Sequence, residues 1–150
     1  MGRFNHIRRV THLVGGRTIT FRSLFEYHYC VWLQLQKEQR IILDWWYEDE
    51  IIELEQQYST KPKRYLPDFT VQMLDGSYEF EETKGYFPSK DYTKLRLYAD
   101  QYDTPLTLIF ASTPYGSQKR RAERIEKHIK RVIYDAEKSI FTKISFLFDE

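Results

Sequence analysis

The stretch that decides the fold is PDFTVQMLDGSYEFEETKG, residues 67–85. Asp75-Gly76 within it is a strong signal for a hairpin turn. Apolar and polar residues alternate on both sides of the turn, which predicts antiparallel strands over 65–73 and 78–84. Gly85 then breaks the second strand.

These two strands bring reactive side chains to one end of a sheet. Residues two apart in a strand share a face, so Glu82 and Lys84 project together, and the hairpin carries Asp68 back beside them. Oxygen ligands from Asp68 and Glu82 suit Mg²⁺, which Mn²⁺ can replace, and the backbone carbonyl of Thr83 can supply another oxygen. A metal there polarises a phosphate and acidifies a water, while Lys84 orients that water or offsets developing charge. The grouping therefore suits phosphodiester hydrolysis.

Each of these residues also has a purely structural interpretation. Asp68 can be a turn residue, and Glu82 and Lys84 can be a solvated pair on one strand face. The solvated-pair interpretation suits Glu79 and Glu81 better, because they lie on the opposite face of the same strand. We therefore expect Glu79 and Glu81 to be exposed.

Upstream of the hairpin the pattern predicts further strands and one helix. Gly15-Gly16 is a turn signal between two short strands, and apolar residues recur at helical spacing over 23–38. A strand is expected over 40–46, and the acidic stretch 44–55 is expected to end in a second strand that pairs with it. The segment 57–63 is expected to be a loop.

Downstream of the hairpin, helices and strands alternate. Ser89 is the expected N-cap of a helix running to Tyr102, and 105–110 is an apolar run typical of a buried strand. A basic amphipathic helix is expected over 116–136, and the tail 141–148 is expected to add a last strand. Without a repeat or linker, residues 1–150 predict a single α/β domain with a mixed central β-sheet flanked by helices.

Composition narrows the class of protein. The 150 residues are 41% hydrophobic and 30% charged, enough for a real core with a solvated surface. A single cysteine, Cys30, excludes internal disulfides and cysteine-rich zinc sites. No stretch approaches the roughly 18 apolar residues of a membrane span, and the first ten residues lack a signal peptide's apolar core, so we expect an intracellular protein without a membrane partner.

The net charge of +1 argues against a dedicated nucleic-acid binder, but its distribution does not. Residues 1–22 hold five arginines and no acid, 116–131 hold seven basic and two acidic residues, and 44–55 hold six acids and no base. Such blocks are more often solvated faces than binding sites. Because the hairpin suits metal-dependent phosphodiester hydrolysis, we expect the basic N-terminal arm and the basic C-terminal helix to contact DNA phosphates. The expected contacts are Arg8, Arg9, Arg22, Lys90, Lys94, Lys119, Arg120, Arg121, Arg124 and Lys127.

The hairpin resembles the signature of the PD-(D/E)XK nuclease superfamily. Pro67-Asp68 opens one strand, and Glu82-Thr83-Lys84 closes the next, followed by Gly85 and a helix. The resemblance implies a restriction-endonuclease-like core and a magnesium-dependent endodeoxyribonuclease, with Asp68 and Glu82 as metal ligands and Lys84 as a catalytic residue.

A narrower resemblance points to phage endonuclease I, the Holliday-junction resolvases of this superfamily, and to related small phage nucleases. Their F-R-S-x-x-E segment supplies an extra active-site glutamate, and Phe21-Arg22-Ser23-Leu24-Phe25-Glu26 stands in that place here. The match covers about residues 20–112, without the acidic stretch or the basic C-terminal helix. It implies a phage enzyme acting on branched DNA in the cytoplasm of a bacterial host. Because a junction needs two symmetric cuts, it also implies a homodimer.

Glu26 carries two competing interpretations. Ser23 and Glu26 form the S-x-x-E pattern of a helix capping box. The resemblance instead makes Glu26 catalytic, and in the simplest geometry the two roles exclude each other.

Two other functions fit the same residues. A transposon-end or restriction-like endonuclease would nick duplex DNA beside a partner protein. A non-catalytic DNA-binding module would keep the fold alone, and the intact set of Asp68, Glu82 and Lys84 speaks against it.

Overall fold

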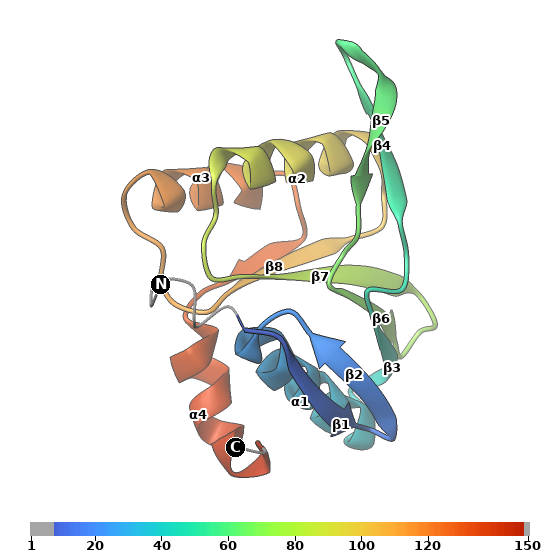
Figure 1. Ribbon diagram of the computed structural model, residues 1–150, viewed down its shortest axis with the longest axis vertical. Helices are drawn as coiled ribbons and strands as arrows, with labels where there is room; N and C mark the ends of the chain where they lie inside the picture. The colour runs from blue at the N-terminus through green and yellow to red at the C-terminus, as the bar shows by residue number, and fades with distance from the viewer. Residues whose placement is uncertain (1–7, 149–150) are drawn as a thin grey trace.

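A computed structural model describes residues 8–148 and shows a mixed α/β protein (Figure 1). Its central sheet has the strand order β3 (Ile42–Tyr47), β6 (Phe69–Met73), β7 (Tyr78–Lys84), β8 (Leu106–Phe110) and β9 (Arg131–Ile133). Strand β6 is antiparallel to β3 and β7, whereas β8 runs parallel to both β7 and β9. The predicted mixed central sheet flanked by helices is confirmed.

Helices cover both faces of this sheet (Figure 1). Helices α2 (Ser89–Gln101) and α3 (Gly116–Glu126) pack on one face. Helix α1 (Leu24–Glu38) and a C-terminal helical segment lie on the other. Because β8 is buried along its whole length, its apolar sequence LTLIF supplies both layers: Leu108 joins the core beneath α2 and Ile109 the core beneath α1.

The central hairpin forms where the sequence predicts it. Gly76 adopts φ 90°, which favours glycine, and Asp75 Oδ1 accepts a hydrogen bond of 2.9 Å from the Ser77 backbone N–H. The resulting register pairs Thr70 with Phe80 and Phe69 with Glu81. This register places the start of β6 beside the end of β7, so that Asp68 lies next to Glu82.

The region 52–65 differs from the prediction. The acidic stretch does not pair with β3: β4 (Ile52–Gln56) pairs instead with β5 (Ser59–Tyr65), so the predicted loop 57–63 is also wrong. A turn at Gln57-Tyr58 is short enough to join adjacent strands, and this favours the local pairing. The β4–β5 hairpin projects from the body of the protein (Figure 1).

The basic helix is shorter than predicted. Helix α3 ends at Glu126, and Val132 and Ile133, expected on the helix, instead lie in β9 beside Leu108 and Ile109 of β8. The β-branched pair thereby fills an open parallel edge that a longer helix would leave unpaired.

The predicted last strand over 141–148 is also wrong. The chain there is helical, through η2 (Glu137–Phe141), α4 (Thr142–Ile144) and η3 (Ser145–Leu147). Ile140, Ile144 and Phe148 recur every four residues, a helical period, and Phe141 packs against Phe25 of α1 with ring centroids 5.4 Å apart.

The N-terminal half otherwise follows the sequence. Gly15-Gly16 joins β1 (Val10–Val14) to β2 (Arg17–Phe21), as predicted. Residues 1–7 of the predicted basic arm lie outside the described residues.

Ser89 is the first residue of α2 rather than its N-cap, which is Pro88. Among residues 8–148, no helix is long and apolar enough to span a bilayer.

Candidate active site

Asp68 immediately precedes β6 and is hydrogen-bonded to the end of β7. Its Oδ2 accepts hydrogen bonds from the Thr83 backbone N–H (2.8 Å) and the Thr83 hydroxyl (2.6 Å). The residue is 7% exposed, and burial raises the pKa of its carboxyl although both Thr83 donors oppose the rise. The predicted meeting of Asp68 with the Glu82-Thr83-Lys84 segment is thus observed.

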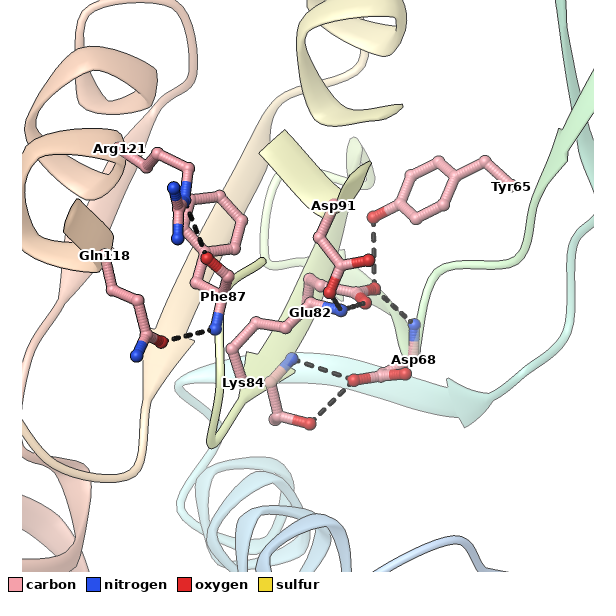
Figure 2. A network of polar contacts seen from close by, with 9 residues as sticks. Tyr65, Asp68, Glu82, Lys84, Phe87, Asp91, Gln118 and Arg121 are labelled. Carbon is pink, nitrogen blue, oxygen red and sulfur yellow. Dashed lines mark hydrogen bonds and ion pairs between the residues drawn. The ribbon is translucent and has the colours of Figure 1, made fainter. Parts of the chain in front are cut away.

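Glu82 is held from two sides. Its Oε1 accepts hydrogen bonds of 3.1 Å from the Tyr65 hydroxyl and from the backbone N–H of Asp68 (Figure 2). Burial, and then the charge of Asp68, raise the pKa of Glu82 to about 8. Glu82 and Asp68 are therefore two carboxylates fixed against each other in a site that disfavours their joint ionisation.

Lys84 lies between two carboxylates. Its Nζ is 3.4 Å from Oε2 of Glu82 and 3.0 Å from Oδ2 of Asp91 on α2 (Figure 2). Burial lowers the pKa of Lys84, but the charges of Glu82 and Asp91 outweigh it, so the pKa lies above its ordinary value. The ammonium is consequently charged at neutral pH.

Glu26 caps the start of α1 and also lines the acidic cavity. Ser23 Oγ accepts the Glu26 backbone N–H (3.2 Å), and Glu26 Oε1 accepts from the Arg22 backbone N–H (3.0 Å) and the Tyr47 hydroxyl (2.5 Å). This is a capping arrangement, yet Glu26 also lines the same cavity as Asp68. The cap uses only Oε1, so it leaves the second carboxylate oxygen for the catalytic role, which stays a prediction.

The three carboxylates differ in how many of their oxygens have a partner. Within residues 8–148, no hydrogen bond reaches Oδ1 of Asp68 or Oε2 of Glu26, and Oε2 of Glu82 meets only Lys84. Burial, and then the charge of Asp68, raise the pKa of Glu26 to about 7. A divalent cation would relieve this mutual repulsion.

A cavity of about 470 Å³ joins these groups. Across the described residues, no three His, Cys, Asp or Glu side chains converge closely enough to hold a metal ion by themselves. Mg²⁺ commonly uses one or two carboxylates and completes its shell with waters and substrate phosphate, so the donor set fits that ion. The candidate metal-binding atoms are Oδ1 of Asp68, which accepts no hydrogen bond within residues 8–148, and Oε2 of Glu82, which meets Lys84.

The ten predicted DNA contacts fall into three groups. Arg22 and Lys94 line the acidic cavity, and Arg22 Nε forms an ion pair with Glu48 (2.6 Å). Arg121 Nε donates to the Phe87 carbonyl (2.9 Å), so this guanidinium holds a loop. The others are solvent-exposed: Arg8, Arg9, Lys90, Lys119, Arg120, Arg124 and Lys127.

Sequence reasoning misses the residues that orient the site. Tyr47, Tyr65 and Asp91 contact Glu26, Glu82 and Lys84, respectively, from other elements. A first-turn acid on the helix after the E-x-K strand is a usable signal for Asp91, whereas no local pattern identifies the two tyrosines.

Glu79 and Glu81 are not the exposed pair that the alternation predicts. They are 1% and 4% exposed on the opposite face of β7. Lys130 Nζ lies 2.5 Å from Glu79 Oε1, and the Tyr29 hydroxyl donates to Glu81. The strand is therefore lined by carboxylates on both faces, but only one face opens into the cavity.

Comparison of the chain with protein-family models, curated proteins and solved structures finds no match.

Proposed function

We propose that the chain is a magnesium-dependent endodeoxyribonuclease with a restriction-endonuclease-like core, acting on branched DNA. The observation that carries this proposal is the grouping of Asp68, Glu82 and Lys84 at one end of the β6–β7 hairpin. The grouping is built from backbone and side-chain hydrogen bonds, so it is preorganised rather than a chance meeting of surface charges.

Asp68, Glu82 and Glu26 would have different roles at the site. Asp68 would hold Mg²⁺ through Oδ1 and Glu82 through Oε2, with the Thr83 carbonyl as a further ligand, and Mn²⁺ would substitute. Bound there, the ion would polarise a phosphate and lower the pKa of a water. Glu26 offers Oε2 to the same cavity and would orient that water.

Lys84 would act as a fixed positive charge. Because Glu82 and Asp91 keep it protonated, it suits the stabilisation of charge that develops on the phosphate better than proton abstraction. Arg22 and Lys94 at the cavity wall would help to hold the DNA backbone there.

Cleavage of a panel of structured DNAs tests the proposal. We expect the protein with Mg²⁺, but not with EDTA, to cut four-way junctions and flaps in preference to linear duplex. Preference for linear duplex would instead favour the restriction-like or transposon-end alternative. Failure to cut any DNA with Mg²⁺ or Mn²⁺ contradicts the proposal.

A further inference from the structure

A second cavity of about 890 Å³ opens directly beside the acidic one. It lies between the start of α1, the loop after β7 and the C-terminal helical segment. Four residues line both cavities: Arg22, Glu26, Thr83 and Lys84. The two cavities are therefore adjacent, so a strand with a phosphate in the acidic cavity can place a neighbouring nucleotide at this second opening.

The lining of the second cavity differs in kind from that of the first. Beyond the shared residues it combines a set of apolar and aromatic side chains with the polar residues Ser23, Ser112, Glu137, Thr142 and Ser145. The apolar and aromatic set is Leu24, Phe25, Tyr86, Ala111, Phe141 and Phe148. Its volume lies within the range of about 300–1,000 Å³ that is usual for sites of small organic molecules. Such a wall suits a flat, partly apolar group rather than a phosphate.

Tyr86 is presented at this cavity by a clamped backbone. Its side chain is 64% exposed, whereas the next residue, Phe87, is fully buried. The Phe87 N–H donates to Gln118 Oε1 (2.7 Å), and Arg121 Nε donates to the Phe87 carbonyl (2.9 Å), so α3 holds both sides of that residue (Figure 2). An exposed aromatic ring on a fixed backbone loses little freedom when it stacks on a ligand.

We propose that this second cavity receives an unpaired nucleobase of the DNA strand that crosses the acidic cavity. The inference rests on the proposed function and specifies its substrate. Paired bases stay stacked inside the duplex, which presents sugars and phosphates to a surface, so only a base that has left the stack reaches an aromatic wall. The cavity thus selects flaps, forks and branch points over intact duplex.

Binding in EDTA, where nothing is hydrolysed, tests the inference on the full chain. On DNA with a single-stranded flap, we expect Tyr86→Ala to bind about tenfold more weakly than wild type, within the range of one base–aromatic stack. On linear duplex the two should bind equally. Tyr86→Phe, which keeps the ring, should bind like wild type, as should Tyr58→Ala, whose ring is 91% exposed on the β4–β5 hairpin.

Removing the base from the DNA provides the matching change. A series of flaps carries one abasic site each, at successive unpaired nucleotides beside the branch. We expect wild type to bind one flap of this series about tenfold more weakly than the intact flap. Tyr86→Ala should bind that flap no more weakly than the intact one, because the base and the ring act as a pair.

The inference is overturned by equal losses for Tyr86→Ala on flap and duplex, by an abasic penalty that is the same with and without Tyr86, or by no loss at all. A change in the sedimentation of the free protein without a change in flap binding also overturns it and makes this face a contact between copies. A chain that binds flaps as described but cuts no DNA refutes the proposed hydrolysis alone.

Discussion

Thr83 determines the orientation of Asp68. Its backbone N–H and hydroxyl both donate to Oδ2, which leaves Oδ1 without a hydrogen bond among the described residues. The side chain of Thr83 is therefore a positioning group for the proposed metal ligand, in addition to the carbonyl role that the sequence suggests.

Removing the Thr83 hydroxyl should weaken the binding of Mg²⁺ without removing a proposed ligand. For Thr83→Val we expect the Mg²⁺ concentration for half-maximal cleavage to rise about 10- to 100-fold, the usual effect of losing a partner that orients a ligand. Thr93→Val, which removes an exposed hydroxyl bonded to the Ser89 carbonyl, is the control and should leave the Mg²⁺ requirement unchanged. An unchanged requirement in Thr83→Val would show that Asp68 needs no such support.

Glu81 gives the stability of the protein a dependence on pH. Burial, and then Glu79, raise the pKa of Glu81 to about 8, far above the 4.5 of an unperturbed glutamate. Between these values the folded state holds a proton that the unfolded state has released, so the free energy of unfolding falls as pH rises from about 4.5 to 8. The slope for one such proton is at most about 1.4 kcal/mol per pH unit.

Glu81→Gln mimics the protonated carboxyl and should remove this contribution. We expect the variant to lose less stability than wild type between pH 5 and 8, as measured by urea unfolding at several pH values. Glu123→Gln, on the exposed surface of α3, should keep the wild-type slope. A slope in Glu81→Gln as steep as in wild type would mean that Glu81 is ionised throughout.

At the scale of elements, α3 has two sides with different tasks. Gln118 and Arg121 hold the loop after β7, whereas Arg120, Arg124 and Lys127 face solvent. The triple exchange of Arg120, Arg124 and Lys127 for Ala should reduce the slope of log K against log salt by about 0.9 for each DNA phosphate that these side chains neutralise in wild type. Lys61→Ala, on the exposed β4–β5 hairpin, is the control. A wild-type slope in the triple variant would show that this side of α3 does not meet DNA.

Elements specified by local signals could be predicted from the sequence. The Asp75-Gly76 turn sets the register of β6 and β7, and with it the meeting of Asp68 and Glu82. Ser23 likewise marks the start of α1. These signals act over a few residues, so a single sequence is enough to read them.

Features decided by long-range packing could not be predicted. Val132 and Ile133 suit the end of a helix as well as a strand, and only the open edge of β8 selects the strand. Tyr65 and Tyr47 reach Glu82 and Glu26 across 17 and 21 residues of sequence. Alternation places Glu81 on the opposite face of its strand but does not reveal the α1 helix that covers that face.

At the scale of the whole molecule, the net charge of +1 conceals an acidic site within a surface that carries basic segments. Resolution of a four-way junction needs two symmetric cuts, so the proposed function predicts a homodimer with two sites. Sedimentation should give a dimer at micromolar concentration, alone or on a junction. A strict monomer that nevertheless resolves junctions fully would contradict this prediction.

The most direct test of the account is single-turnover cleavage of a four-way junction with Mg²⁺ by wild type and by Asp68→Asn. The variant keeps the shape of the side chain and an oxygen for the Thr83 donors but loses the ligand charge. Asp75→Asn, in the exposed turn of the same hairpin, is the matched control and should cut like wild type. We predict that Asp68→Asn binds the junction as wild type does and cuts it at least about 100-fold more slowly. Cleavage by Asp68→Asn at the wild-type rate would contradict the account.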